Sequence, residues 1–123
     1  MFDLTPEEAR LLLNVALMAV GRNRFRSAAA ILAALERFRP NHPSIAEAKM
    51  VALMSAGDFL AAVTYADGDG SRNFPNSAML QAFKGMALIR LDRKSEARDV
   101  LSAVAAQDGN PAAARMAQDL LKG

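Results

Sequence analysis

The stretch Gly57-Asp58-Phe59-Leu60-Ala61-Ala62 decides the fold of this 123-residue chain. Glycine followed by aspartate ends one helical segment, and an aromatic residue followed by small residues opens the next. The spacing Phe59-x-x-Ala62 occurs 34 residues earlier as Phe25-x-x-Ala28, and Ala97 follows Ala62 after 35 residues. Self-similarity at such a period is typical of stacked supersecondary units, so we predict a helical repeat protein.

Helices separated by short polar breaks account for the rest of the chain. Thr5-Pro6-Glu7-Glu8 has an N-cap, a proline at the first helical position and a glutamate placed to complete a capping box. Ser44 with Glu47, and Asn110 with Pro111, are similar start signals. One inserted residue within 67–74 would explain the change of offset from 34 to 35. We expect helices over residues 6–21, 25–39, 44–56, 59–66, 76–91, 94–107 and 111–122, and a loop over 67–73.

Composition and charge limit the function classes. Apolar residues make up 52% of the chain and charged residues 23%, which is typical of one soluble domain. The chain has no cysteine and only one histidine, His42, so thiolate and imidazole chemistry have almost nothing to use. The 15 basic and 13 acidic residues lack the clustered basic excess of a nucleic-acid binder. We therefore expect a binding protein that is not an enzyme, with no cofactor, no metal and no nucleic-acid partner.

The amino-terminal residues bear on the location of the protein. Asp3, Glu7 and Glu8 stand where a secretory signal would carry basic residues. The most apolar run, residues 11–20, is about half as long as a membrane-spanning helix. We therefore expect a cytoplasmic protein without a membrane partner.

One acidic stretch has the opening spacing of a calcium-binding loop. Asp67, Asp69 and Ser71 match that spacing, but Arg72 stands at the glycine position and Ala78 where a bidentate glutamate is needed. A plain loop is therefore the preferred interpretation.

Two basic features lie at predicted turns. Arg22, Arg24 and Arg26 alternate along one turn, where they form either a solvated corner between helices or a contact for an anionic partner. His42, between two prolines, is expected to be a solvent-facing turn residue and not a ligand or base.

The repeat resembles the tetratricopeptide repeat, a 34-residue helix-turn-helix unit. Its pattern has small residues where the helices cross, glycine and an aromatic residue in the turn, alanine opening the second helix, and a proline near the end. The matching residues here are Ala16, Phe25, Ala28, Leu35 and Pro40 in the first repeat, Gly57, Phe59 and Ala62 in the second, and Gly85 in the third, whereas Met50 departs from the small crossing residue. The resemblance implies a single all-α domain with repeats over about 9–42, 43–77 and 78–110 and a capping helix over 111–122.

The resemblance also implies a concave groove, lined by the first helix of each repeat, that binds peptides. The corresponding positions carry one charge among ten residues: Leu13, Leu17, Val20, Glu47, Val51, Met54, Met79, Ala82, Met86 and Ile89. They lack the lysine, asparagine and arginine set with which related modules clamp a terminal carboxylate. An apolar, methionine-bearing surface suits the apolar face of a helix. Methionine and leucine at helical spacing are also ordinary core, and that interpretation stays open.

The helix over residues 6–21 is apolar nearly all round, with Asn14 as the only polar residue between positions 11 and 20. A helix of this kind is expected to be covered on every side. The first helix of a stack has a repeat on one side only, so we expect a second protein, a second copy or a ligand helix to contact Leu11, Leu12, Val15 and Met18.

Small three-repeat proteins of this kind resemble the chaperones of bacterial type III secretion systems, above all those that hold the needle subunit. That resemblance implies a groove that clasps the amphipathic carboxy-terminal helix of a filament-forming subunit and prevents premature polymerisation, with a small helical co-chaperone on the first helices. Two alternatives remain. One is a structural tetratricopeptide adaptor or homodimerising scaffold in a larger complex, and the other is a wall-associated or periplasmic factor of the secretion apparatus.

Overall fold

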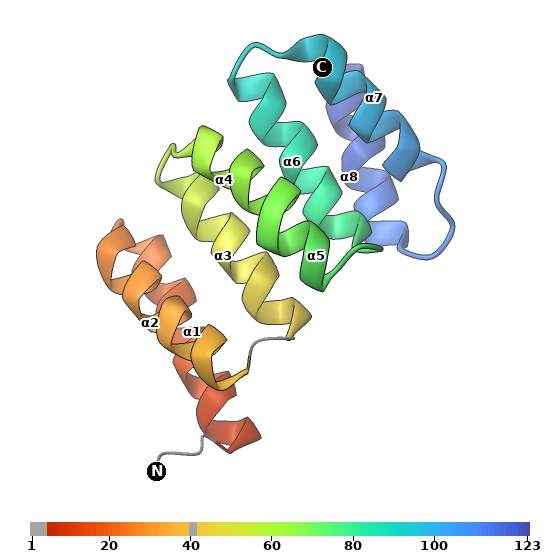
Figure 1. Cartoon of the computed structure of the whole chain (residues 1–123). Helices are drawn as coiled ribbons and strands as arrows, with labels where there is room; N and C mark the ends of the chain where they lie inside the picture. The colour runs from red at the N-terminus through yellow and green to blue at the C-terminus, as the bar shows by residue number, and fades with distance from the viewer. Residues whose placement is uncertain (1–4, 40–41) are drawn as a thin grey trace. The chain divides into compact units, whose positions relative to one another are not determined.

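In the computed structural model of the chain, every secondary-structure element within residues 5–39 and 42–123 is a helix (Figure 1). The predicted all-α class is confirmed. Asp3, Pro40 and Asn41, which served above as sequence signals, lie outside the described residues.

The chain divides into two compact units at the turn between Gly57 and Asp58. This division falls inside the second predicted repeat. The N-terminal unit contains α1 (Pro6–Gly21), α2 (Phe25–Phe38) and α3 (Pro43–Ser55). The C-terminal unit contains α4 (Phe59–Tyr65), the π-helical segment η1 (Ala66–Gly70), α5 (Ser71–Asn73), α6 (Ala78–Arg90), α7 (Lys94–Ala105) and α8 (Pro111–Lys122).

The N-terminal unit is built around mutual contacts of its three helices. α1 packs against both α2 and α3, and α2 packs against α3. Their buried residues form one apolar cluster, consisting of Ala16, Val20, Ala28, Leu32, Leu35, Ile45, Ala48 and Ala52. Small side chains make up half of this cluster, which lets the helices approach closely.

The C-terminal unit is centred on α6, which contacts α4, η1, α7 and α8. Gly85 lies where α6 meets α7, and a Cβ atom at this position would be only 2.4 Å from Cδ2 of Leu101. Glycine is therefore needed for the close approach of the two helices. α8 packs against α6 and α7, and its residues Ala113 and Ala117 are fully buried.

Three of the predicted helix starts can be compared directly with the structure. The capping box of α1 is present: the backbone N–H of Glu8 donates to Oγ1 of Thr5 over 3.1 Å, and that of Thr5 donates to Oε1 of Glu8 over 3.2 Å. Asn110 caps α8 by accepting from the N–H of Ala113 over 3.0 Å. The expectation that Ser44 caps the third helix is wrong. α3 begins one residue earlier, with His42 as N-cap, because the fixed φ of Pro43 already suits the first helical position.

The three short turns between paired helices share one backbone conformation. Their central residues, Asn23, Gly57 and Asp92, have φ values of 61°, 77° and 60° and are spaced by 34 and 35 residues. The residue that follows each of them opens the next helix with nearly the same dihedral angles: φ −98° and ψ 64° at Arg24, −91° and 65° at Asp58, and −104° and 62° at Arg93. Asparagine and aspartate are the side-chain-bearing residues that best tolerate positive φ, so they substitute for glycine here.

The segment over residues 67–73 is helical, and the prediction of a loop there is wrong. α4, η1 and α5 follow one another without a break from Phe59 to Asn73. A π turn is closed by i→i+5 hydrogen bonds and so contains one residue more than an α turn. With this extra residue, Gly70 lies on the buried side of the continuous helix, while Asp69 is exposed. The inserted residue inferred from the change of repeat offset thus corresponds to η1.

Candidate functional site

The candidate site of the N-terminal unit is the surface of α1 and α3 beside a cavity of about 300 Å³. The cavity lies between the first half of α1, the end of α2 and the start of α3. Its lining combines apolar side chains with two arginines and a histidine, the full lining being Pro6, Ala9, Arg10, Leu13, Arg39, His42, Ser44 and Ile45. A cavity with this lining can accept an apolar side chain that is accompanied by a negative charge.

The predicted groove residues of the N-terminal unit differ in exposure. Leu17 is 40% exposed, whereas Leu13, Glu47, Val51 and Met54 are half-buried. Leu13 and Val51 also pack against the apolar cluster. Val20 belongs to that cluster and is buried, so its position in the structure is that of a core residue.

Glu47 is the one carboxyl group among these positions. Partial burial on α3 raises its pKa above the ordinary glutamate value, because desolvation disfavours the charged form. An apolar partner covering α3 would desolvate this carboxyl further.

In the C-terminal unit the predicted groove residues all lie on α6. Met79, Met86 and Ile89 are half-buried, and Ala82 is fully buried. Ile89 lines a second cavity, of about 230 Å³, together with residues of α7 and α8. Ala82, like Val20, therefore occupies a core position, while the three larger side chains retain accessible surface.

Three apolar side chains of α1 point away from the core, and we call them the outer face of α1. Leu11, Val15 and Met18 are 64%, 41% and 57% exposed. They are spaced by four and three residues, which places them on one side of the helix. Leu12, predicted to be a contact of the same kind, instead packs against the apolar cluster.

The structure gives the acidic residues of the 67–73 segment a different setting from a calcium loop. Oδ1 of Asp67 accepts from Nζ of Lys84 over 2.6 Å, and Asp69 pairs with Arg72 one helical turn away. Both carboxylates project from continuous helix and face cations. Within residues 5–39 and 42–123, no three acidic, histidine or cysteine side chains are grouped as metal ligands would be.

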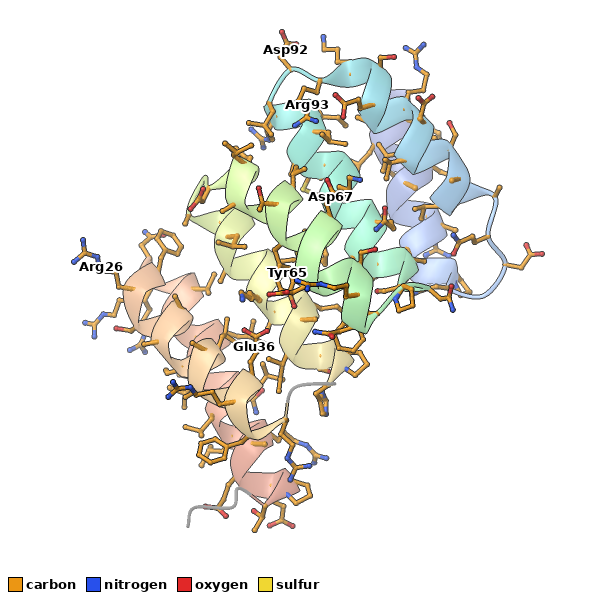
Figure 2. The ribbon with its side chains drawn as sticks, in the orientation of Figure 1. Arg26, Glu36, Tyr65, Asp67, Asp92 and Arg93 are labelled. Carbon is orange, nitrogen blue, oxygen red and sulfur yellow. The ribbon has the colours of Figure 1, made fainter. Side chains whose placement is uncertain are left out.

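The basic turn residues and His42 are open to solvent. Arg22, Arg24 and Arg26 are exposed, and Arg26 projects away from the helices in Figure 2. His42 is exposed at the rim of the N-terminal cavity. In the part of the chain that the structure describes, none of the charged residues is buried.

Two ion pairs that sequence reasoning missed link successive helices within each unit. Nζ of Lys49 on α3 lies 2.9 Å from Oε1 of Glu36 on α2, and Lys84 on α6 pairs with Asp67 on η1. Glu36 and Asp67 are both labelled in Figure 2. The two lysines are 35 residues apart and occupy equivalent repeat positions, so the repeat offset was the signal that could have found them.

Comparison with known proteins found no similarity: no protein-family model, no curated protein and no solved structure matches this chain. The helices of the described residues are also too short or too polar for any of them to cross a lipid bilayer.

Proposed function

We propose that this chain is a chaperone that binds the apolar face of a helix from a self-assembling protein and so delays assembly. By the resemblance described above, the partner is the needle subunit of a type III secretion system, bound in the cytoplasm with the help of a small helical co-chaperone. The proposed contact surface consists of the accessible groove residues on α1 and α3 of the N-terminal unit. The accessible predicted groove residues on α6 form a separate candidate surface of the C-terminal unit.

The observation that carries this proposal is the combination of exposed and half-buried apolar side chains on α1 and α3 beside the N-terminal cavity. Leu17, Val51 and Met54 offer contact area, and the cavity under Leu13 offers a place for an anchoring side chain. Flexible methionine side chains adapt to differently shaped apolar partners. Helix-in-groove recognition depends on such a surface with few charges.

The tendency of a filament subunit to self-associate explains why a cell would need such a protein. A subunit whose apolar helix packs against copies of itself polymerises as long as that helix is exposed. A second protein that covers the same helix blocks the growing surface. The chaperone must release its partner later, so an interface of moderate affinity is sufficient.

Helix binding is tested with a fluorescent synthetic helix that has leucines at positions i, i+3, i+4 and i+7, and with a scrambled peptide of the same composition. We expect the amphipathic peptide to bind with a dissociation constant on the order of micromolar and the scrambled peptide to bind much more weakly. Equal binding of both peptides would contradict the proposal.

Variants locate the contact. Leu17→Glu and Met54→Glu place a charge in the proposed contact surface and are expected to weaken peptide binding about tenfold or more. Leu60→Glu is the matched control, because Leu60 on α4 is equally apolar and 61% exposed but lies outside the predicted groove. Met86→Glu tests the α6 surface of the C-terminal unit separately, and loss of helicity in that variant would show that Met86 is a core residue.

The chaperone role itself is tested by polymerisation. A purified needle subunit of a type III system from the same cells is incubated with and without the chain while light scattering is recorded. We expect equimolar chain to suppress the increase in scattering, and Leu17→Glu to fail to do so. The alternative, an adaptor or scaffold, predicts no suppression by either protein.

A further inference from the structure

The outer face of α1 corresponds to a face that is buried in the other repeats. Leu11 and Met18 align at the repeat offsets with Ile45 and Ala52 on α3, and with Leu80 and Ala87 on α6. All four of these equivalents are buried, whereas Leu11 and Met18 are exposed. In the N-terminal unit α3 packs against α2, and its Ile45 and Ala52 belong to the apolar cluster that the helices share, so the equivalent face of α3 is covered by helix packing.

Val15, which lies between Leu11 and Met18 on the outer face of α1, is apolar where the equivalent residues are charged. The equivalents of Val15 are Lys49 and Lys84, each of which pairs with a carboxylate of the preceding helix. Val15 needs no acidic partner. A lysine at this position would face its own copy across a two-fold axis and repel it, but a valine packs against itself.

Charges at the two ends of α1 have opposite signs. Glu7 and Glu8 lie in the first turn, and Arg22 follows the last turn, with Arg24 and Arg26 close behind it. Antiparallel alignment of two such helices brings the acidic end of each against the basic end of the other. It also places Leu11 opposite Met18, and Val15 beside the two-fold axis. Parallel alignment would instead bring like charges together.

We propose that the outer face of α1 binds the same face of a second copy of this chain, with the two α1 helices antiparallel. This interface uses a side of α1 other than the one that carries Leu13 and Leu17, so it goes beyond the proposed binding of a helix in the groove and does not depend on it. A co-chaperone on the outer face of α1 would compete with the second copy. It also gives the basic corner of Arg22, Arg24 and Arg26 an anionic partner. One helix of 16 residues is about 24 Å long, so the contact is small and the dimer dissociates on dilution.

The oligomeric state of the full chain is measured by sedimentation velocity over a concentration series. We expect a reversible monomer–dimer equilibrium. Met18→Glu should raise the dissociation constant about tenfold or more, whereas the matched control Leu60→Glu should leave it unchanged. A chain that stays monomeric up to millimolar concentration, or a control that dissociates as readily as Met18→Glu, would overturn the proposal.

The orientation is tested by exchanging charges. Glu7→Arg and Arg22→Glu should each weaken the dimer severalfold at low salt, and the double variant should recover the parent dissociation constant. Glu7 is the better choice of the two glutamates because Glu8 also caps the helix. Failure of the double variant to recover, with helicity unchanged, would contradict the antiparallel pairing.

Disulfide cross-linking is an independent test of the antiparallel orientation. The chain has no cysteine of its own, so any disulfide that forms must involve the introduced residues. Leu11→Cys and Met18→Cys should form a mixed disulfide when the two variants are combined, and neither should form one alone. The two positions are about 10 Å apart along the helix, too far for a bond in the parallel arrangement. Cross-linking of Leu11→Cys with itself would overturn the antiparallel arrangement. Peptide binding by the same variants should stay at the parent level, which separates failure of this interface from failure of the groove.

Discussion

The first helix of the N-terminal unit, α1, and the last helix of the C-terminal unit, α8, expose different kinds of side chain to solvent. In the C-terminal unit, α8 lies against α6 and α7, buries Ala113 and Ala117, and presents polar side chains such as Gln118 and Asp119 to solvent, with Leu121 as its one large apolar side chain that is exposed, at 39%. In the N-terminal unit, α1 leaves Leu11, Val15 and Met18 exposed. The outermost helices of a repeat stack normally present polar side chains to solvent. The contrast teaches that α1 leaves more apolar surface available for association than α8 does.

The largest expected effect comes from a substitution on the buried face of α8. Ala117→Glu puts a carboxylate into a fully buried position and is expected to cost about 3 kcal/mol or more of the free energy of unfolding. Met18→Glu makes a similar change on the exposed outer face of α1 and should leave the stability of the dilute monomer nearly unchanged. Urea denaturation monitored by circular dichroism measures both. Equal destabilisation would show that α1 is as enclosed as α8.

A second prediction compares the small residues at which helices cross in the two units. Gly85→Ala introduces a methyl group 2.4 Å from a Leu101 carbon, and we expect a loss of about 2 kcal/mol. Ala16→Gly at the equivalent position of α1 should cost about 1 kcal/mol through lost helix propensity. Thermal unfolding of both variants gives the order. A neutral Gly85→Ala would mean that α6 and α7 separate easily.

The turns should behave alike in both units. Asn23→Ala, Gly57→Ala and Asp92→Ala each place alanine at positive φ, and each is expected to cost about 1 kcal/mol. The control is Gly21→Ala, where a new Cβ meets nothing within 4 Å and the helix is expected to gain stability. Unequal losses at Asn23 and Asp92, measured by urea denaturation, would show that the two ends differ in their turns as well as in their outer faces.

The smallest effect concerns pH and Glu47. The pKa of this carboxyl is raised in the folded chain, so the folded state binds the proton more tightly than the unfolded state does. The free energy of unfolding therefore falls as the pH rises from the ordinary glutamate pKa through the raised one. Glu47→Gln removes this dependence and should raise the melting temperature by about a degree at pH 7, with a smaller gain at pH 4. A lower melting temperature in this variant at pH 7 would mean that the carboxylate is stabilised by its surroundings.

Local signals in the sequence predicted most of the fold. Thr5 and Asn110 are good caps whatever surrounds them, because their side chains bond to backbone groups within one turn. Gly57 marked one turn correctly. The turns after residues 21 and 91 were also predicted, but Asn23 and Asp92 were not identified as their positive-φ residues, because polar residues at a turn carry no distinctive signal until the turn geometry is known.

Where tertiary packing decides, the sequence misled. Asp67-Gly68-Asp69-Gly70 has the composition of a loop, yet contacts of η1 with α6 keep it helical. Glycine fits at position 70 because a Cβ there would come 3.0 Å from the backbone oxygen of Tyr65. For the same reason the groove prediction could not separate Val20 and Ala82, which are core, from Leu17, which is exposed. Periodicity gives the side of a helix, but the neighbours determine how far each residue on that side is covered.

The π turn over Ala66–Gly70 also marks a place where this chain can change its length. Loss of one residue within a regular helix rotates everything after it by about 100° and turns buried side chains outward. Loss of Gly68 would convert the π turn into an α turn and leave Gly70 facing α6. A single-codon deletion that would disrupt a regular α-helix is therefore expected to be absorbed at residues 66–70, and homologous chains are expected to vary in length by one residue at this point.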